Sequence, residues 1–366
     1  MRLSQPYAET DEMTGSPRTA LANKRIVVAG EFWHGAPAKG FASGFRALGC
    51  DVIEIDVNHF LPLPHTTSLR ITSRILARQL KKNYNDFILS VCRTKKIDVF
   101  FQIKGNGVSY HTLDLINKIN VETALFYPDV DFNHPGVRLE KTLLNKHIFS
   151  TKKFHKPFFQ ETYGREIVHL NHGYSPAVHR PCAALLDEAG FAWDISYVGN
   201  PSPYKLRWLI SVVSAFPDKR IKIIGNNWLK IGKGTAIEPY LARNAVTGDA
   251  LADVIETSKI NLAFHYGPAG THGWQDSISA RTFQIPASRG FMLHVDNAEI
   301  RDLFSVPDEI DVFEGPDDLN EKIAYYLENP VIRQQMNQKA HKRCVPAYSL
   351  DARARAIIAQ IDNIRS

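Results

Sequence analysis

The stretch RIVVAGEFWHGAPAKGFASGFRALGCDVIEID (residues 25–56) decides the fold. Its two ends are short apolar runs suited to buried strands. Its middle places Phe41, Phe45 and Leu48 at helical spacing before a terminal Gly49. A strand, a glycine-rich turn, a helix and a second strand make a βαβ unit, whose crossover is nearly always right-handed. The stretch therefore predicts an α/β fold built on a parallel sheet.

The same alternation of strand and helix signals continues along the chain. The segment SYHTLDLINKI is helix-like, with Ser109 as its N-cap, and a second helix is expected from Lys205 to Ser214. The remaining strand-like runs are DVFFQI (98–103), TALFY (123–127), HIFS (147–150), EIVHL (166–170), DISYVGN (194–200), RIKIIGNNW (220–228), INLAFHY (260–266), GFMLHV (290–295) and EIDVF (309–313). We therefore expect two doubly wound α/β halves in series.

One segment breaks this rhythm, NHGYSPAVHRP (171–181), which carries a glycine and two prolines and marks the domain boundary. We expect a disordered leader at 1–24, a first domain at 25–175, a second domain at 176–348 and a C-terminal segment at 349–366. That last segment reads as an amphipathic helix capped by Ser349. It is expected to cross back and brace the first domain.

Composition limits the class of protein. The chain has 366 residues, of which 44% are hydrophobic and 22% charged, as in soluble globular proteins, and its length suits two domains. The net charge of +6 favours anionic partners, but no nucleic-acid-binding pattern accompanies it. The four cysteines form no C-x-x-C pair, so free buried thiols are expected. No secretory signal and no long apolar run is present, which predicts a cytoplasmic protein.

Several segments together resemble the glycosyltransferases of the GT-B fold, and among these the spore-maturation CgeB-like proteins grouped with transferase families 1 and 4. The resemblance runs over roughly residues 25 to 360. The segments that carry it are GFASGFRALGCDVIEID (40–56), TALFYPDVDFN (123–133), IVHLNHGYSPAVHRP (167–181), SYVGNPSPYKLRWL (196–209), RTFQIPASRGFMLHV (281–295), EIDVFEGPDDLNEKIAYYLENPVIRQQM (309–336) and AYSLDARARAII (347–358). It implies two Rossmann-like domains facing a central cleft, with the acceptor on the first and a nucleotide-diphosphate sugar on the second.

The resemblance also assigns roles to Asp276 and Gln284. Related retaining enzymes carry two glutamates at this separation, the first reaching the donor sugar and the second the ribose hydroxyls. Carboxylate and amide oxygens both accept hydrogen bonds from hydroxyls. This chain has a shorter acid and a neutral amide at the two positions, which leaves retention or inversion of the anomeric carbon open. The alternative for Asp276 is an N-cap of a helix at 277–284.

Cations must offset the donor diphosphate, because GT-B enzymes generally use no metal. The segment GNPSPYKLRW offers Gly199 and Asn200 for close backbone approach, a helix start near Pro203, and the side chains of Lys205 and Arg207. Arg281 is a further candidate, because it lies on the same helix face as Gln284; the alternative is a salt bridge to Asp276 or Glu299. The loop with His265, His272 and Trp274 could close over the sugar, and its histidines lack zinc-ligand spacing.

The first domain supplies candidates on the acceptor side. The glycine-rich loop after residue 30 lacks a dinucleotide fingerprint and a P-loop. It carries His34, a candidate base because histidine is the residue type suited to proton transfer at neutral pH. Other loop candidates are Gly35, Lys39 and Gly40. The pair Asp129 and Asp131 follows an apolar strand as D-x-D. We expect this pair to act as a base or to bind acceptor hydroxyls rather than a metal. The alternative for His34 is a structural loop histidine. The alternative for the two aspartates is turn chemistry, in which they cap local backbone groups.

The segment LRITSRILARQLKK (69–82) predicts a basic amphipathic helix, because Arg70, Arg74 and Arg78 recur every four residues opposite apolar side chains. It could rest on anionic lipid at the membrane's inner face, or be a core helix with a solvated basic face.

Taken with the resemblance, the sequence predicts a metal-independent glycosyltransferase acting on a glycan, lipid-linked saccharide or protein in polysaccharide biosynthesis. The rival functions are a sugar-nucleotide epimerase of the same fold and a nucleotide-sugar-binding protein without activity.

Overall fold

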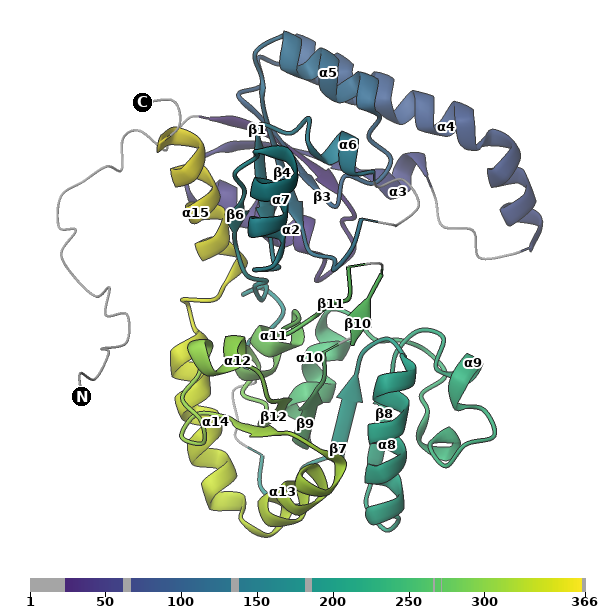
Figure 1. The fold of residues 1–366 in the computed structure, drawn as a ribbon, viewed down its shortest axis with the longest axis vertical. Helices are drawn as coiled ribbons and strands as arrows, with labels where there is room; N and C mark the ends of the chain where they lie inside the picture. The colour runs from purple at the N-terminus through teal and green to yellow at the C-terminus, as the bar shows by residue number, and fades with distance from the viewer. Residues whose placement is uncertain are drawn as a thin grey trace, which may run out of the picture.

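The computed structural model describes residues 24–61, 67–132, 138–181, 186–265, 267–270 and 272–363. Within these residues the chain forms two α/β domains, stacked one above the other in Figure 1, and each domain has a parallel sheet between helices. The predicted leader lies outside the described residues, apart from Lys24. The two-domain Rossmann-like architecture expected from the sequence is confirmed.

The first domain holds a six-stranded parallel sheet in the order β2-β1-β3-β4-β5-β6. The strands are β1 (Arg25–Gly30), β2 (Asp51–Asp56), β3 (Val99–Ile103), β4 (Glu122–Tyr127), β5 (His147–Ser150) and β6 (Val168–His169). Its helices are α2 (Pro37–Ala47), α3 (Val57–Phe60), α4 (Thr67–Thr94), α5 (Tyr110–Lys118), α6 (Leu139–Thr142) and α7 (His155–Tyr163). The Ser109 side chain accepts a hydrogen bond from Thr112 N, so the predicted cap of α5 is confirmed.

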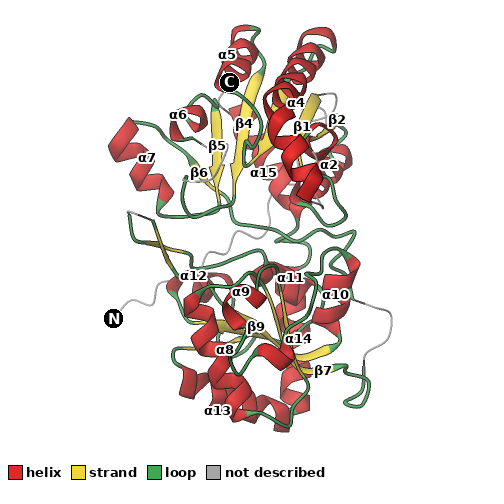
Figure 2. Cartoon of the chain, turned by 90° about the vertical axis from the view of Figure 1, so that its right-hand side faces the viewer, coloured by secondary structure: helices red, strands yellow, loops and turns green. Residues whose placement is uncertain are grey.

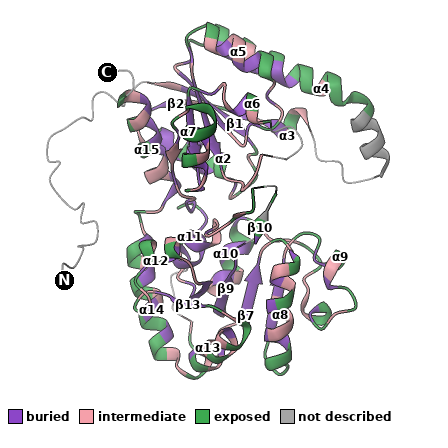
Figure 3. Cartoon of the chain, in the orientation of Figure 1, coloured by how far each residue is buried: buried purple, intermediate pink, exposed green. Residues whose placement is uncertain are grey.

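Both faces of this sheet are buried, as Figure 3 shows by the purple of its strands. Successive side chains of a strand point to opposite faces. Thus Ile26 and Val28 of β1 pack in the cluster that contains α2, whereas Val27 and Ala29 pack in the cluster that contains α4 and α5. A strand that is apolar at every position is what a parallel sheet covered on two faces requires.

The second domain repeats the design with a five-stranded parallel sheet in the order β13-β12-β9-β7-β8. The strands are β7 (Trp193–Val198), β8 (Ile221–Ile224), β9 (Ser258–Ala263), β12 (Met292–Val295) and β13 (Asp311–Phe313). The helices are α8 (Pro203–Ala215), α9 (Leu229–Gly232), the 3-10 helix η1 (Glu238–Tyr240), α10 (Asp249–Glu256), α11 (Arg281–Ala287), α12 (Ala298–Leu303), α13 (Pro316–Glu328) and α14 (Pro330–Cys344). A two-stranded antiparallel hairpin of β10 (Pro268–Ala269) and β11 (Trp274–Gln275) stands apart from the sheet.

The last helix, α15 (Leu350–Asn363), returns to the first domain and packs beside α2, as predicted. Its N-cap is Ser349, whose hydroxyl accepts a hydrogen bond from Ala352 N. The two helices come close because α2 has glycines at the contact. A Cβ on Gly44 would lie 2.9 Å from Ala354 Cβ, and one on Gly40 would overlap the Leu350 side chain. Gly40, predicted to face an acceptor, therefore serves helix packing.

The topology places one ligand crevice in each domain. Strand order reverses between β1 and β3 in the first sheet and between β7 and β9 in the second. Ligands of open parallel sheets bind outside the carboxyl ends of strands at such points. Figure 2 shows the loops of the two domains meeting between the sheets. The two switch points therefore open into the same space.

Candidate functional site

A cavity of about 610 Å³ lies between the two domains. Lys104, Asp129 and Asp131 line it from the loops after β3 and β4. From the second domain it is lined by backbone and side chains that follow β7 and β9 and by the segment leading into α11. The cleft expected between the domains thus has walls from both, and most of them come from the carboxyl ends of strands.

One wall of the cavity is built around the start of α8. Ser202 caps this helix by accepting a hydrogen bond from Lys205 N, and the Lys205 side chain folds back to donate to Asn200 O at 3.1 Å. Gly199 and Asn200 line the same wall. Lys205 is 6% exposed, and its burial lowers its pKa to about 8 although Asp276 nearby raises it. A helix start and a buried cation here make an anion-binding wall.

Arg281 and Gln284 continue this wall on the first turn of α11. Arg281 Nε donates to Val198 O at 3.1 Å, and its Nη1 donates to Gln284 Oε1. Burial lowers the pKa of the Arg281 guanidinium to about 10, so it remains a cation at neutral pH. The two side chains share one helix face, as predicted, and the alternative salt bridge from Arg281 to Asp276 does not form.

Asp276 lines the cavity from the extended segment before α11. It is not a helix N-cap, because α11 begins only at Arg281 and its cap position is Ala280. Its Oδ1 forms an ion pair with the ammonium of Lys152, which comes from the first domain. The ion pair joins the two domains at the edge of the cavity.

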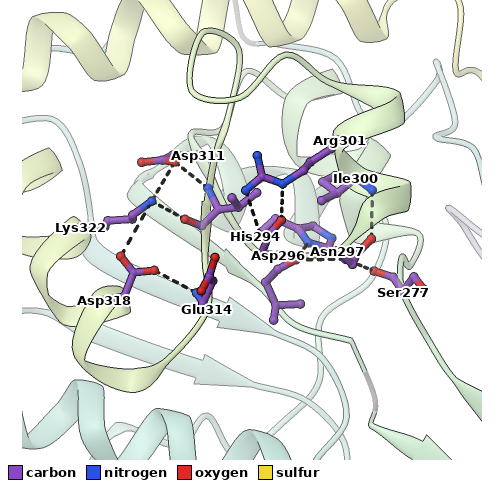
Figure 4. A network of polar contacts seen from close by, with 12 residues as sticks. Ser277, His294, Asp296, Asn297, Ile300, Arg301, Asp311, Glu314, Asp318 and Lys322 are labelled. Carbon is purple, nitrogen blue, oxygen red and sulfur yellow. Dashed lines mark hydrogen bonds and ion pairs between the residues drawn. The ribbon is translucent and has the colours of Figure 1, made fainter.

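The segment around Asp276 is anchored from behind by a polar network (Figure 4). Asn297 Nδ2 donates to Ser277 O at 2.9 Å, and Asn297 Oδ1 accepts from Ile300 N at 3.0 Å to cap α12. Arg301 binds Asp296 beside it with two hydrogen bonds. The residue next to Asp276 is therefore fixed to a helix of its own domain.

The D-x-D pair faces the cavity from the first domain. Asp129 Oδ2 lies 3.0 Å from Lys104 Nζ, and the Asp131 carbonyl accepts a hydrogen bond from the Tyr127 hydroxyl. Both aspartates line the cavity opposite Lys205. Their position after β4 puts two carboxylates on the wall that faces the cationic one.

A second pocket of about 440 Å³ adjoins the first and shares Lys104, Asp129, Asn200 and Arg281 with it. Gln284 lines this second pocket. The loop after β1 lines it too, through Glu31, Trp33 and Gly35.

The candidate base His34 does not line either cavity. Its Nε2 lies 3.0 Å from Asp249 Oδ1 at the start of α10, where both side chains are exposed. A Cβ on Gly35 would lie 3.0 Å from Gly248 Cα, so the loop after β1 touches the second domain here. His34 therefore bridges the domains outside the two pockets, and its role as a base stays a prediction.

Three other predicted residues also lie elsewhere. Arg207 and Lys39 are exposed and line neither cavity. Arg207 is two residues from Lys205 on α8, and that spacing turns its side chain to another face of the helix. His265 is buried, stacked on Tyr204 with ring centroids 4.9 Å apart, and lines neither cavity, so it supports the wall behind Lys205.

Three lining or supporting residues were missed from the sequence: Lys104, Lys152 and His172. Lys104 follows β3 directly and Lys152 follows β5 closely, so the rule that ligands bind at carboxyl ends of strands could have found both. His172 lines the second pocket, and its burial holds the pKa of its imidazole well below the usual range. It lies in the segment that was interpreted as a domain boundary and as part of the resemblance, without a role for this residue.

In the described part of the chain, no group of three or more His, Cys, Asp or Glu side chains is placed to hold a metal ion. Cys50, Cys92 and Cys344 are buried thiols outside any disulfide, as expected, and Cys182 lies outside the described residues. No helix among the described residues is long and apolar enough to cross a membrane.

Residues 204–359 match a family model described as glycosyl transferase-like. This match covers α8 through most of α15 and so contains Lys205, Asp276, Arg281 and Gln284. Solved glycosyltransferases have the same two-domain fold. The chain has the GT-B fold. None of the curated proteins compared with the sequence matches it.

The structural matches cover nearly the whole chain. A sucrose-phosphate synthase from Thermosynechococcus elongatus is 9% identical with a TM-score of 0.63, over 93% of this chain and 99% of that one. A glycosyltransferase from Rickettsia africae is 13% identical with a TM-score of 0.63, over 94% and 99% of the two chains. Anabaena HepE, solved with UDP-glucose, is 10% identical with a TM-score of 0.58, over 93% and 99%. At such identities the likeness concerns the fold.

Proposed function

We propose that the transferase takes a glycosyl group from a nucleotide-diphosphate sugar in the cleft and passes it to a hydroxyl of an acceptor held by the first domain. The observation that carries the proposal is the convergence of Lys205, Arg281 and the start of α8 on one wall of the cavity. This wall complements the charge of a diphosphate. Anabaena HepE, which has the same fold, was solved with UDP-glucose.

In this arrangement the diphosphate lies against Lys205 and Arg281, with backbone approach at Gly199 and Asn200. The sugar extends into the larger cavity toward Asp276. The ribose lies in the adjoining pocket at Gln284, whose amide has hydrogen-bonding capacity beyond its bond from Arg281. Because Asn200 and Arg281 line both pockets, one extended ligand can occupy the two without crossing a wall.

The reaction breaks the bond between the anomeric carbon and the diphosphate oxygen, and the electron pair leaves with the diphosphate. The acceptor oxygen forms the new bond to the anomeric carbon and releases its proton. In this proposal Asp131, which lines the cavity from the first domain, receives that proton, and Asp129 binds an acceptor hydroxyl. Lys205 and Arg281 stabilise the charge that develops on the leaving group.

We further propose that the transfer needs no metal, because the two cations and the helix start supply the charge that a metal would bring. Addition of EDTA should leave the turnover of a nucleotide sugar unchanged. A loss of activity that magnesium restores would contradict this proposal.

A transferase differs from the two rival functions because its turnover of the donor depends on an acceptor. The glycosyl transferase-like match favours transfer over the epimerase and over a binding protein without activity. A thermal-shift screen of UDP-, GDP-, CMP- and dTDP-sugars identifies the donor, because a ligand of the folded state raises the melting temperature. NMR of that donor with a panel of saccharide acceptors then tests the reaction. Isomerised donor, or binding without turnover across the panel, would contradict transfer.

The acceptor class and the finer family remain proposals. We infer a place in the CgeB-like branch and in polysaccharide biosynthesis from the segments quoted above, which run through both domains.

We also propose that α4 contacts an anionic membrane. Ile75 is 76% exposed and Leu76 is 46% exposed, beside the exposed Arg78, Lys81 and Lys82, and the helix extends past the domain in Figure 1. The side chains at 69–74, with Arg70 and Arg74, lie outside the described ones.

The exposure of Ile75 and Leu76 favours membrane contact over the core helix, the two alternatives that the sequence left open. Flotation with vesicles of phosphatidylcholine alone and with added phosphatidylglycerol tests it. The double variant I75S/L76S should lose the flotation that phosphatidylglycerol confers. Flotation that is absent in the wild type, or retained in the variant, would contradict it.

A further inference from the structure

The ion pair between Lys152 and Asp276 is buried although it joins two domains. The side chain of Lys152 is 3% exposed and that of Asp276 is 14% exposed. Lys152 Nζ also donates to Ile278 O at 3.3 Å, so the same ammonium binds the segment at two points. A buried ammonium that loses its carboxylate is left with an uncompensated charge, so the contact strongly favours this arrangement of the two domains.

The geometry leaves Asp276 able to bind a ligand as well. A carboxylate has two oxygens and about four acceptor positions, and the Lys152 ammonium donates a hydrogen bond to Oδ1. Asp276 lines the cavity, whereas Lys152 does not and approaches it from behind. The carboxylate can therefore accept hydrogen bonds from sugar hydroxyls while Lys152 holds its position.

Charge gives this support a second role. A carboxylate close to a diphosphate repels it, and the repulsion is strong where water is largely excluded. Lys152 and Asp276 form a pair that carries no net charge. Lys152 therefore reduces the extent to which Asp276 offsets the charges of Lys205 and Arg281 on the diphosphate.

A cluster of aromatic side chains also joins the two domains close to the ion pair of Lys152 and Asp276. Trp274, two residues before Asp276, stacks on Phe154 of the first domain with ring centroids 5.2 Å apart, and meets Phe158 edge-on at 5.0 Å. His272 stacks on Trp274 at 4.3 Å and contacts Phe158 at 5.0 Å. The β10–β11 hairpin thus reaches across the boundary toward α7, as Figure 2 shows. Its end is tied to the first domain just before Asp276.

We propose that Lys152 is a positioning residue of the transferase: it crosses the domain boundary, orients the Asp276 carboxylate toward the sugar of the bound donor and neutralises it beside the diphosphate. The inference rests on the proposed function, since it gives Asp276 a donor sugar to bind. Donor-sugar recognition is then completed only when the two domains close on each other. The hairpin with Trp274 makes that closed arrangement the stable one.

The first experiment needs no ligand. Lys152→Met, Asp276→Asn and the double variant are compared by thermal unfolding. Each single variant should lower the melting temperature by about 4 °C or more, and the double variant by no more than the larger single effect, because the charges compensate each other. Additive losses in the double variant would overturn the ion pair as a functional unit.

The second experiment separates positioning from general damage, with UDP and UDP-glucose as probes. Lys152→Met should lower UDP affinity less than about tenfold, because the unpaired Asp276 carboxylate then repels the diphosphate, and should lower kcat for UDP-glucose hydrolysis about 10- to 100-fold, because the sugar also loses its positioned carboxylate. Lys152→Arg should restore part of the loss. The matched control is Lys153→Met, because Lys153 also pairs across the boundary, with Asp302 at 2.9 Å, but is exposed and lines neither cavity.

The outcomes are distinct. Equal losses of UDP and UDP-glucose binding in Lys152→Met, or equal effects of Lys152→Met and Lys153→Met, would overturn the positioning role. Wild-type protein that binds no nucleotide and no nucleotide sugar would instead overturn the proposed function, while the unfolding experiment would still decide whether Lys152 and Asp276 act as a pair.

Discussion

Arg281 and Gln284 lie one helical turn apart on α11, and the Arg281 guanidinium donates a hydrogen bond to the Gln284 side-chain oxygen. The same guanidinium also donates to Val198 O at the carboxyl end of β7. The arginine is therefore fixed in two directions before any ligand arrives. A cation held in this way loses little conformational entropy when it binds a phosphate.

Arg281→Met should raise the dissociation constant of UDP about 10- to 100-fold, because a hydrogen bond to a charged group contributes about 1.5 to 3 kcal/mol. Titration calorimetry measures it. Arg207→Met is the matched control, since Arg207 is an exposed arginine of the same domain outside both cavities, and its effect should stay within about twofold. Equal losses in the two variants would mean that net charge of the domain, and not the position of Arg281, governs binding.

Asp131→Asn should lower donor turnover about 100-fold or more while UDP affinity stays within about twofold, because the change removes a proton acceptor from the acceptor wall. Asp129→Asn should lower it less. The Asp129 carboxylate lies 3.0 Å from Lys104 Nζ, and we give it the binding of an acceptor hydroxyl rather than the proton transfer. Turnover of the preferred nucleotide sugar measures both, and a larger loss in Asp129→Asn would reverse the two roles.

Local patterns in the sequence were enough for the fold and for part of the site. The βαβ unit at residues 25–56, the caps at Ser109 and Ser349 and the start of α8 are set by neighbours in sequence, and each is present. The same is true of the shared helix face of Arg281 and Gln284. Such features need only the short-range preferences of strands, turns and helix ends.

Contacts between the domains were not predictable in the same way. Lys152 and Asp276 are 124 residues apart, and His34 is 215 residues from Asp249, so no local pattern links them. The glycine at position 40 was interpreted as a loop residue because close helix contact with α15 depends on how the chain returns. The misplacement of Arg207 was avoidable, since a helix with 3.6 residues per turn separates it from Lys205.

Gly44→Ala should destabilise the protein although alanine is the better helix former. A Cβ at this position would lie 2.9 Å from Ala354 Cβ and 3.0 Å from the Asp351 backbone. Overpacking costs about 1 to 3 kcal/mol, more than the gain of about 1 kcal/mol in helix propensity. Gly315→Ala is the control, because no atom lies within 4 Å of its Cβ position, and it should cost less than about 1 kcal/mol. Denaturant unfolding measures both, and a more stable Gly44→Ala would show that α15 can shift.

Lys205 should make donor binding depend on pH. Burial lowers its pKa to about 8 from 10.5, so the ammonium that binds the diphosphate is present below pH 8 and is lost above it. We expect the dissociation constant of UDP-glucose to be constant from about pH 6.5 to 7.5 and to rise by up to tenfold per pH unit above about 8.5. Lys205→Arg, which stays charged, should give a flat profile over this range. A wild-type profile equally flat to pH 10 would contradict the role of Lys205.

The same burial predicts a conflict between stability and function at Lys205. The folded protein disfavours the charged ammonium, and this lowers the free energy of unfolding. The loss is present in full below pH 8 and disappears as the pH rises toward 10.5. Lys205→Met should therefore increase the free energy of unfolding at pH 7 by about 1 to 3 kcal/mol while abolishing donor binding, and the gain should shrink above pH 8. Denaturant unfolding at pH 7 and pH 9.5 measures both effects. A variant that is less stable than the wild type at pH 7 would mean that Lys205 contributes to the fold and is not a strained binding group.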